Sequence, residues 1–263
     1  MIRILNGAAL AALCLFSAPS TVRAEQPAQA GTRTEPTADL AAILDYVDDL
    51  YSSKSSHTSV AMHVVTEHAT RDMKMETWSK GEERFLVRIL APEKEAGTST
   101  LKNGTNVWNY FPKINQVTKV SASLMNAGWM GSHVTNGDIV KRNRMSQSYT
   151  YAKSFEGDRE GQNVIELTLD PKPNAPVVWG KVVVIVRRSD RNPLQIRYYD
   201  EGKALAQTWS FSDIRKLGGR DVPTTIKVVP ASKPREYTEL HYTSMELNIA
   251  LDDTLFSQRS LQK

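Results

Sequence analysis

Cysteine is almost absent from this sequence, which contains a single one, Cys14, in 263 residues. Lipoprotein signal peptidase requires a small residue directly before the cysteine that receives the lipid. Leu13 is too bulky for that position, so no lipid attachment is expected at Cys14. The chain after residue 24 has no thiol and therefore no disulfide, although many exported domains depend on disulfides. Its stability must come from a hydrophobic core, and the remaining length is sufficient to bury one.

A marked excess of either charge is also missing. The 33 lysine and arginine residues face 29 acidic residues, which gives a formal net charge of +4. Proteins that bind nucleic acid usually carry a larger local positive excess, because phosphate contacts dominate their affinity. We therefore expect no nucleic acid partner.

The motifs of common catalytic sites are missing as well. No phosphate-binding loop or dinucleotide fingerprint occurs, and Gly131-Ser132-His133 lacks the frame of a nucleophile elbow. His57 and His63 fall on one face of a predicted strand, but no third ligand is spaced to complete a metal site. We expect no enzyme activity, no metal and no cofactor. A hydrolytic site assembled from distant residues is the alternative that spacing leaves open.

The N-terminus has the features of an export signal. Arg3 precedes the short apolar run 8–16, and Val22-Arg23-Ala24 places small residues where signal peptidase cleaves. The run is too short to span a bilayer. The sequence predicts a signal peptide at 1–24, cleaved after Ala24, and a flexible leader at 25–37. An uncleaved N-terminal anchor is the alternative.

Residues 39–51 have the period of an amphipathic helix. Apolar side chains recur at spacings of three and four, which places them along one helix face. Thr37 is a suitable N-cap, and Asp45, Asp48 and Asp49 are expected on the face toward solvent. The apolar positions are Leu40, Ile43, Leu44, Val47, Leu50 and Tyr51.

From Thr58 onward the hydrophobic period changes to two, which is typical of β-strands. Turn signals such as Asn103-Gly104 separate the strands, and no βαβ pattern occurs, so an antiparallel meander is predicted. The stretch 121–146 breaks this pattern and is expected to form short helices and loops. About a dozen strands are predicted, at 57–67, 71–79, 84–90, 99–101, 106–111, 116–120, 149–155, 163–169, 181–188, 194–199, 204–214, 224–229 and 235–248.

Several of these strands are apolar on both faces. Residues 182–186 form an unbroken apolar run, and Arg88 is the only polar residue between Leu86 and Leu90. A sheet with one face in water would alternate strictly, so both faces of this sheet should be partly covered. The predicted fold class is mainly β (α+β). Residues 38–263 are expected to form a single domain, an unclosed antiparallel half-barrel with helices covering its concave apolar face.

The stretch that breaks the strand pattern contains methionine and tryptophan, at Met125, Trp129, Met130 and Met145. Core packing is the ordinary explanation for any one of them. Together they favour an adaptable cover over an apolar sheet, because methionine fits irregular apolar partners. Such a cover suits an acyl chain. Burying a methylene contributes about 0.8 kcal/mol, so a chain of about sixteen carbons needs shielding on the order of 12 kcal/mol.

One segment matches the motif order of a known family. Asn103-Gly104 leads into Trp108-Asn109-Tyr110, then Pro112 and Gln116-Val117-Thr118. In this order the segment resembles the LolA-like periplasmic lipoprotein carriers and their relatives, the outer-membrane lipoprotein-sorting proteins. The resemblance implies an unclosed half-barrel of about eleven strands with helices as a lid over an apolar cavity. It also implies transfer of an acylated lipoprotein from an inner-membrane ABC exporter to an outer-membrane acceptor.

The chain departs from the family pattern just before residue 85. The carriers have an arginine in a Lys-Arg-Pro segment that helps to hold the lid, whereas Gly81 occupies that place here. Arg84 and Arg88 are the alternatives for this role. The chain is also longer than a standard carrier, which leaves open another lipid and a transporter of the RND class.

These observations predict a periplasmic carrier that binds lipid or lipoprotein acyl chains non-covalently and delivers them towards the outer membrane. The alternative is a periplasmic regulatory or protein-binding module of similar fold. In that case the protein's own side chains would fill the concave apolar face, and no lipid cargo would bind. The sequence does not determine which face of each strand lines the cavity, because a shift of one residue in register exchanges the two faces. The residues expected to line the cavity or lid are Leu86, Trp108, Tyr110, Trp129, Met130, Ile185 and Trp209.

Overall fold

A computed structural model of the protein describes residues 37–140 and 144–262. The predicted signal peptide and the leader up to residue 36 lie outside the described residues. By its internal contacts, the segment Glu35–Lys263 forms one compact unit. No helix in the described ranges is long and apolar enough to cross a membrane.

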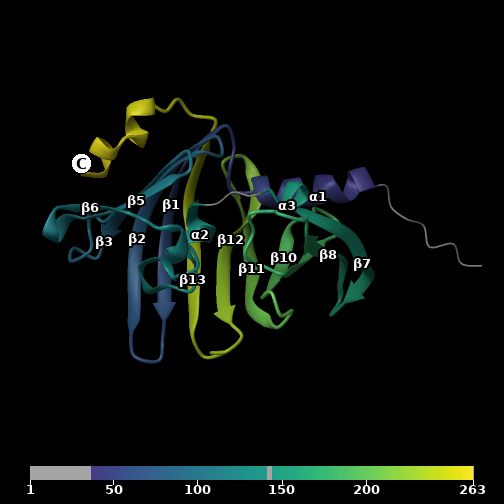
Figure 1. The fold of residues 1–263 in the computed structure, drawn as a ribbon. Coiled ribbons are helices and arrows are strands. Elements are labelled where there is room, and N and C mark those ends of the chain that lie inside the picture. Colours follow the sequence, from purple (N-terminus) through teal and green to yellow (C-terminus); the bar gives the residue numbers. More distant parts are fainter. Residues whose placement is uncertain (1–36, 141–143, 263) are drawn as a thin grey trace, which may run out of the picture. The chain divides into compact units, whose positions relative to one another are not determined.

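Thirteen strands form one antiparallel sheet, in the order β6-β5-β4-β3-β2-β1-β13-β12-β11-β10-β9-β8-β7 (Figure 1). The first six strands form one meander and the last seven another, and β1 pairs with β13 where the two meet. The strands are β1 (Ser55–Val65), β2 (Thr70–Lys80), β3 (Arg84–Ala91), β4 (Ser99–Asn103), β5 (Asn106–Phe111), β6 (Gln116–Lys119), β7 (Tyr149–Arg159), β8 (Gln162–Pro171), β9 (Lys181–Arg187), β10 (Pro193–Tyr199), β11 (Leu205–Leu217), β12 (Arg220–Pro230) and β13 (Tyr237–Leu247).

The two ends of the sheet, β6 and β7, do not pair with each other, so the sheet is unclosed. The prediction of a mainly β, unclosed antiparallel architecture is confirmed. The strand count of about eleven is corrected to thirteen, because the turns of this chain separate more strands than the resemblance implies. One such turn is the predicted Asn103-Gly104 hairpin, where Gly104 has a φ of 61°, a value that glycine adopts without strain.

Side chains alternate between the two faces of the sheet, and both faces are partly buried. In β9, Val182, Val184 and Val186 join a core cluster on one face. Val183 and Ile185, which point the opposite way, join a second cluster with Phe155 and Leu194. The unbroken apolar run of this strand thus reflects two buried faces, as predicted.

Helix α1 (Thr37–Asp49) packs on the face that carries Val182 and Val184. Its buried residues Leu40, Ile43 and Leu44 belong to the same cluster as these valines. The short helix α3 (Met145–Ser148) lies beside α1, as Figure 1 shows. The helix predicted at 39–51 therefore exists, shifted by two residues, and its apolar stripe packs against the sheet.

The segment between β6 and β7 packs on the same face, over the other half of the sheet. It consists of the 3-10 turns η2 (Ala122–Leu124) and η3 (Trp129–Gly131), followed by α2 (Asn136–Val140), which confirms the predicted short helices. Trp129 is 1% exposed and packs with Met62, Val87 and other residues of β1–β3. Its indole N–H donates to Thr100 Oγ1 at 2.9 Å, so this side chain is fixed by a bond as well as by packing.

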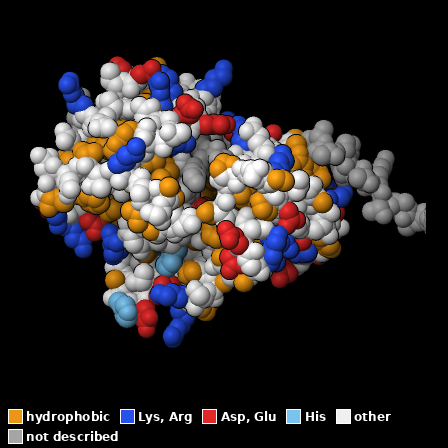
Figure 2. Space-filling model, viewed as in Figure 1, with side chains coloured by type: hydrophobic (Ala, Val, Ile, Leu, Met, Phe, Trp, Pro, Cys, Tyr) orange, Lys and Arg blue, Asp and Glu red, His pale blue; other side chains and the backbone are white. Residues whose placement is uncertain are grey.

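The C-terminal segment covers the opposite face of β3–β5, which the sequence analysis did not predict. It forms the turns η4 (Asp253–Phe256) and η5 (Gln258–Gln262). Phe256 and Leu261 are buried against Leu86, Leu101 and Tyr110. Two further bonds tie the segment down, from Arg88 to the Ser260 carbonyl and from Asn103 to the Phe256 carbonyl. On the face shown in Figure 2, hydrophobic side chains are visible among uncharged ones at the left, where β3–β6 lie in Figure 1.

Candidate functional site

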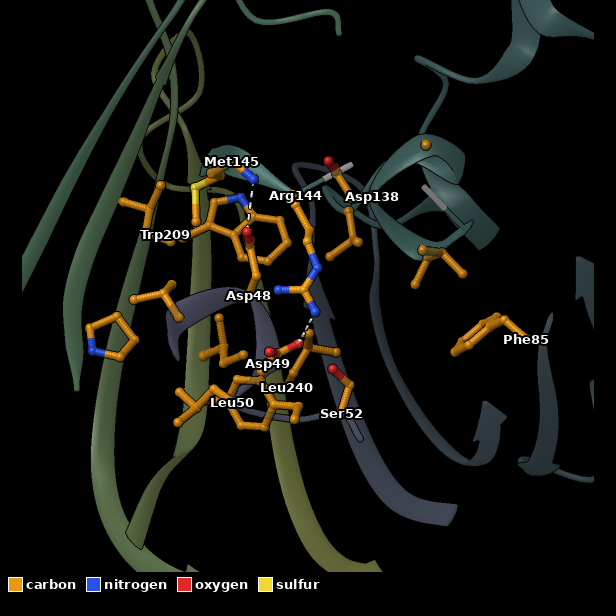
Figure 3. A pocket seen from close by; sticks show the side chains of 18 of the residues that line it. Asp48, Asp49, Leu50, Ser52, Phe85, Asp138, Arg144, Met145, Trp209 and Leu240 are labelled. Carbon is orange, nitrogen blue, oxygen red and sulfur yellow. Dashed lines mark hydrogen bonds and ion pairs between the residues drawn. The ribbon is translucent and has the colours of Figure 1, made fainter. Parts of the chain in front are cut away.

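A cavity of about 720 Å³ lies on the face of the sheet that α1 and α2 contact. Its volume falls within the range of small-molecule sites, roughly 300–1,000 Å³. β1, β3, β11 and β13 supply apolar side chains to its wall, and Figure 3 shows part of this lining. The larger apolar lining residues are Val60, Met62, Met75, Phe85, Val182, Ile196, Trp209, Phe211, Ile226 and Leu240.

Of the seven residues predicted to bind a ligand, Trp209 lines this cavity. Trp129 and Met130 pack in the core cluster on the same face but are not part of the lining. Leu86, Trp108 and Tyr110 lie on the opposite face, against the C-terminal segment, and Ile185 also lies on the opposite face of its strand. Their role in binding stays a prediction, and the structure places only Trp209 where it can contact a ligand in this cavity.

Strands β3 and β9 supply other residues to this cavity than those named from sequence. Phe85 lines it, whereas Leu86 faces the C-terminal segment. Val182 lines it, whereas Ile185, an odd number of residues away, points to the other face. A local pattern that is apolar on both faces does not distinguish the two sides, because the choice depends on the segments that cover each face.

Arg144, which is one of the lining residues, binds three carboxylates. Its guanidinium contacts Asp49 at 2.9 Å, Glu82 at 2.9 Å and Asp45 at 3.4 Å. These ion pairs join α1 to the turn between β2 and β3. The two arginines proposed from sequence to hold a lid lie elsewhere, since Arg84 pairs with Asp253 and Arg88 bonds to the Ser260 carbonyl in the C-terminal segment.

Asp48 lines the cavity, although the helix period predicted it on the solvent side of α1. Its carboxylate accepts the backbone N–H of Met145 at 2.7 Å. Burial raises the pKa of Asp48 to about 7, although the bond from Met145 and the charge of Arg144 act in the opposite direction. The prediction is corrected because the chain after Arg144 folds over this edge of the helix. The available signal was its place four residues after Leu44, at the border of the apolar stripe.

Asp138 is a second acid in the lining. It accepts the backbone N–H of Thr135, and the Thr135 hydroxyl accepts the backbone N–H of Asp138, which is a reciprocal cap at the start of α2. Thr135 is therefore the N-cap of α2, and Asp138 is its partner in the third helical position. Burial raises the pKa of Asp138 above its ordinary value, against the effect of its bonds to Thr135 and Gln207.

Three aromatic rings follow one another along the cavity wall. The rings of Trp179 and Tyr198 are 5.2 Å apart, and those of Tyr198 and Trp209 are 5.7 Å apart. Burial raises the pKa of Tyr198 well above its ordinary value, and the nearby carboxylates of Asp138 and Asp48 add to this effect. Within the part of the chain that the structure describes, the Tyr198 hydroxyl has no hydrogen-bond partner.

One cluster has the residue types of a hydrolytic site, but it is closed to substrate. His133 Nδ1 lies 2.9 Å from Thr238 Oγ1, and His133 Nε2 lies 3.2 Å from a carboxylate oxygen of Glu236. Thr238 is 0% exposed, so no substrate can reach its hydroxyl. These contacts instead fasten the chain after η3 to β13. Among the described residues, no group of three His, Cys, Asp or Glu side chains is placed to hold a metal ion.

The fold and the cavity define a class of protein in which an unclosed antiparallel sheet holds an apolar cavity on one face. Three solved structures share this architecture. A DUF1329 family protein from Desulfovibrio piger has a TM-score of 0.77 and 22% identity, over 87% of this chain and 100% of that chain. A domain named as an outer membrane lipoprotein-sorting protein, from Vibrio parahaemolyticus, has a TM-score of 0.73 and 18% identity, over 87% and 100% of the two chains.

A LolA superfamily protein from Nitrosomonas europaea has a TM-score of 0.70 and 25% identity, over 83% of this chain and 97% of that chain. The resemblance to LolA-like and lipoprotein-sorting proteins is thereby confirmed for the fold. No curated protein matches the chain. A family model described as "-like: Uncharacterized protein" matches residues 81–263, and the chain belongs to that family.

Proposed function

We propose that the protein is a periplasmic carrier that binds the acyl chains of a lipid or lipoprotein non-covalently. The observation that supports this proposal is the cavity of about 720 Å³ with its mainly apolar wall. Trp209, Phe211 and Leu240 offer surfaces to which an acyl chain can transfer from water. Each methylene buried there contributes about 0.8 kcal/mol. The cavity is partly open to solvent, which gives such a chain a route of entry.

Two further observations support the proposed periplasmic location. Residues 1–24 have the composition of an export signal, and two similar structures are named as LolA superfamily or lipoprotein-sorting proteins. The proposed cargo is an acylated lipoprotein or another lipid. The proposed exchange partners are an inner-membrane transporter of the ABC or RND type and an outer-membrane acceptor. Binding and release require no bond-making step, so the proposed protein is not an enzyme.

Native mass spectrometry of the exported protein, purified without detergent, tests the proposal directly. We expect a co-purifying acyl species in a ratio of about one to one, whose head group is then identified after lipid extraction. A mass of the protein alone, together with no uptake of added lipid or acylated peptide, would refute the carrier function. That outcome would favour a module that binds protein at its rim.

A pair of variants on β1 locates the binding site. Val60 lines the cavity, whereas its neighbour Ala61 points to the opposite face. Val60→Trp is expected to fill part of the cavity and to weaken binding of a fluorescent acyl probe, while Ala61→Trp leaves it unchanged. Circular dichroism of both variants confirms that the sheet is retained. Equal binding by the two variants would place the acyl chain somewhere else.

A further inference from the structure

The lining of the apolar cavity includes two buried acidic groups. Asp48 and Asp138 both line it, and Figure 3 shows their side chains among the lining residues. Each accepts a backbone N–H, from Met145 and Thr135 respectively. Among the residues that the structure describes, no lysine or arginine forms an ion pair with either carboxyl.

Three cations of the described chain line the same cavity, and no ion pair joins any of them to Asp48 or Asp138. Arg144 pairs with Asp45, Asp49 and Glu82. Arg220 donates to the carbonyls of Asp49 and Ser52, which end α1 and the turn after it. Lys54 is exposed at the rim. Burial raises the pKa of both carboxyls, so a cation that binds beside them favours their ionised form and, in these low-dielectric surroundings, gains more than it would in water.

Aromatic rings stand in the same wall as these carboxyls. Trp179, Tyr198 and Trp209 form a continuous row, and the charges of Asp48 and Asp138 act on the Tyr198 hydroxyl. Ring faces attract cations through their quadrupole, and an aromatic box is a recurrent device for binding substituted ammonium groups. The Tyr198 hydroxyl, without a partner in the described chain, also remains able to accept or donate a bond.

We propose that the cavity selects an amphiphile with an ammonium head group, bound by Asp48 and Asp138 together with the rings of Trp179, Tyr198 and Trp209. The inference rests on the proposed carrier function, because the hydrocarbon chain of the ligand occupies the apolar remainder of the cavity. A sulfate or phosphate head group bound beside Asp48 and Asp138 would face two carboxyls. An uncharged head group would gain neither the ion pair nor the cation–π contact.

Three probes with the same hydrocarbon chain and different head groups test this selectivity. The probes are dodecyltrimethylammonium, dodecyl maltoside and dodecyl sulfate, each used below its micelle-forming concentration. Displacement of a fluorescent apolar dye gives the Kd of each. The trimethylammonium probe is expected to bind at least about ten times more tightly than the other two, which corresponds to one favourable charged contact.

Two variants connect this preference to the named residues. Asp48→Asn keeps an oxygen for the Met145 N–H but removes the charge, and Trp179→Leu removes one ring of the row. Each is expected to reduce the ammonium preference by about tenfold, while the Kd of the maltoside changes little. The matched control is Asp39→Asn, on the same helix but outside the cavity, where the carboxylate pairs with Arg191. Maltoside binding also verifies that each variant is folded.

The outcomes separate this inference from the proposed function. Equal affinity for all three probes, or a preference for the sulfate, would overturn the ammonium inference while leaving the carrier function intact. An ammonium preference that survives both Asp48→Asn and Trp179→Leu would also overturn it. Absence of binding by any probe would refute the carrier function, and this inference with it.

Discussion

Replacing Asp48 by asparagine is expected to change how the stability of the protein depends on pH. Burial raises the pKa of this carboxyl from its ordinary value of 3.8 to about 7. Between these values the folded protein keeps a proton that the unfolded chain has lost. A carboxyl with a raised folded-state pKa therefore stabilises the fold at low pH, and this contribution is lost as the pH rises through about 7.

The magnitude follows from the difference between the two pKa values. At about 1.4 kcal/mol per pH unit, a difference of roughly three units is worth about 4 kcal/mol. Asparagine keeps an oxygen for the Met145 N–H and cannot ionise. The free energy of unfolding of Asp48→Asn should therefore rise relative to the original protein by about 4 kcal/mol between about pH 4 and about pH 8.

Urea unfolding followed by tryptophan fluorescence measures this difference at a series of pH values. Asp39→Asn is the matched control, because it removes a carboxylate from a more exposed site on the same helix. Parallel pH profiles for Asp48→Asn and the original protein, within about 1 kcal/mol, would show that Asp48 is ionised in the fold at little cost. A difference shared with Asp39→Asn would assign the effect to the charge of the helix instead of burial.

Three further predictions concern the segments that pack on the two faces of the sheet. Trp129→Phe removes the bond to Thr100 and should lower the free energy of unfolding by about 2 kcal/mol in urea titrations, whereas a change below about 0.5 kcal/mol would mean that this bond contributes nothing. Phe256→Ala should lower the free energy of unfolding by about 3–5 kcal/mol, because Phe256 of the C-terminal segment is 1% exposed against β3–β5. Binding of an apolar dye should survive Phe256→Ala, since the cavity is on the other face, and its loss in a folded variant would contradict this assignment. For Glu236, bonds from His133 and Lys233 lower the pKa from 4.5 to about 2, so stability from this group is present above 4.5 and is lost as the pH falls toward 2. Glu236→Gln should abolish that part of the acid sensitivity in an acid titration, and an unchanged acid midpoint would show that the pair does not contribute.

The strands and their antiparallel arrangement could be predicted from the sequence, because the signals for strands and turns are local. Alternation in 57–67 and the turn at Asn103-Gly104 depend on neighbouring residues only, and both appear in the structure. Runs that are apolar on both sides, such as 182–186, also indicated correctly that both faces are covered. The cover over Leu86 was missed, because nothing in the turns after residue 250 indicates which face of which strands they contact.

The candidate site was predicted less well than the fold. Of the residues named from sequence, Trp209 lies on the cavity wall, whereas Phe85 and Tyr198 line the cavity without having been named. Asp48 was assigned to solvent because a helix period describes one helix and not the segment that later folds over it. Asp48 and Tyr198 are 150 positions apart in the chain, and nothing local in the sequence indicates that both line one cavity.

The sequence alone determined the strand period, the turns, the helix at the start of the domain, and the need for a core without disulfides. Those properties follow from short-range sterics and from the alternation of side chains along one strand. Only the tertiary structure decided which face encloses the cavity, which face the C-terminal segment covers, and where the acids lie. Each of these depends on the pairing of β1 with β13 and on three distant segments packing on one sheet, and a shift of one residue in register would exchange the two faces.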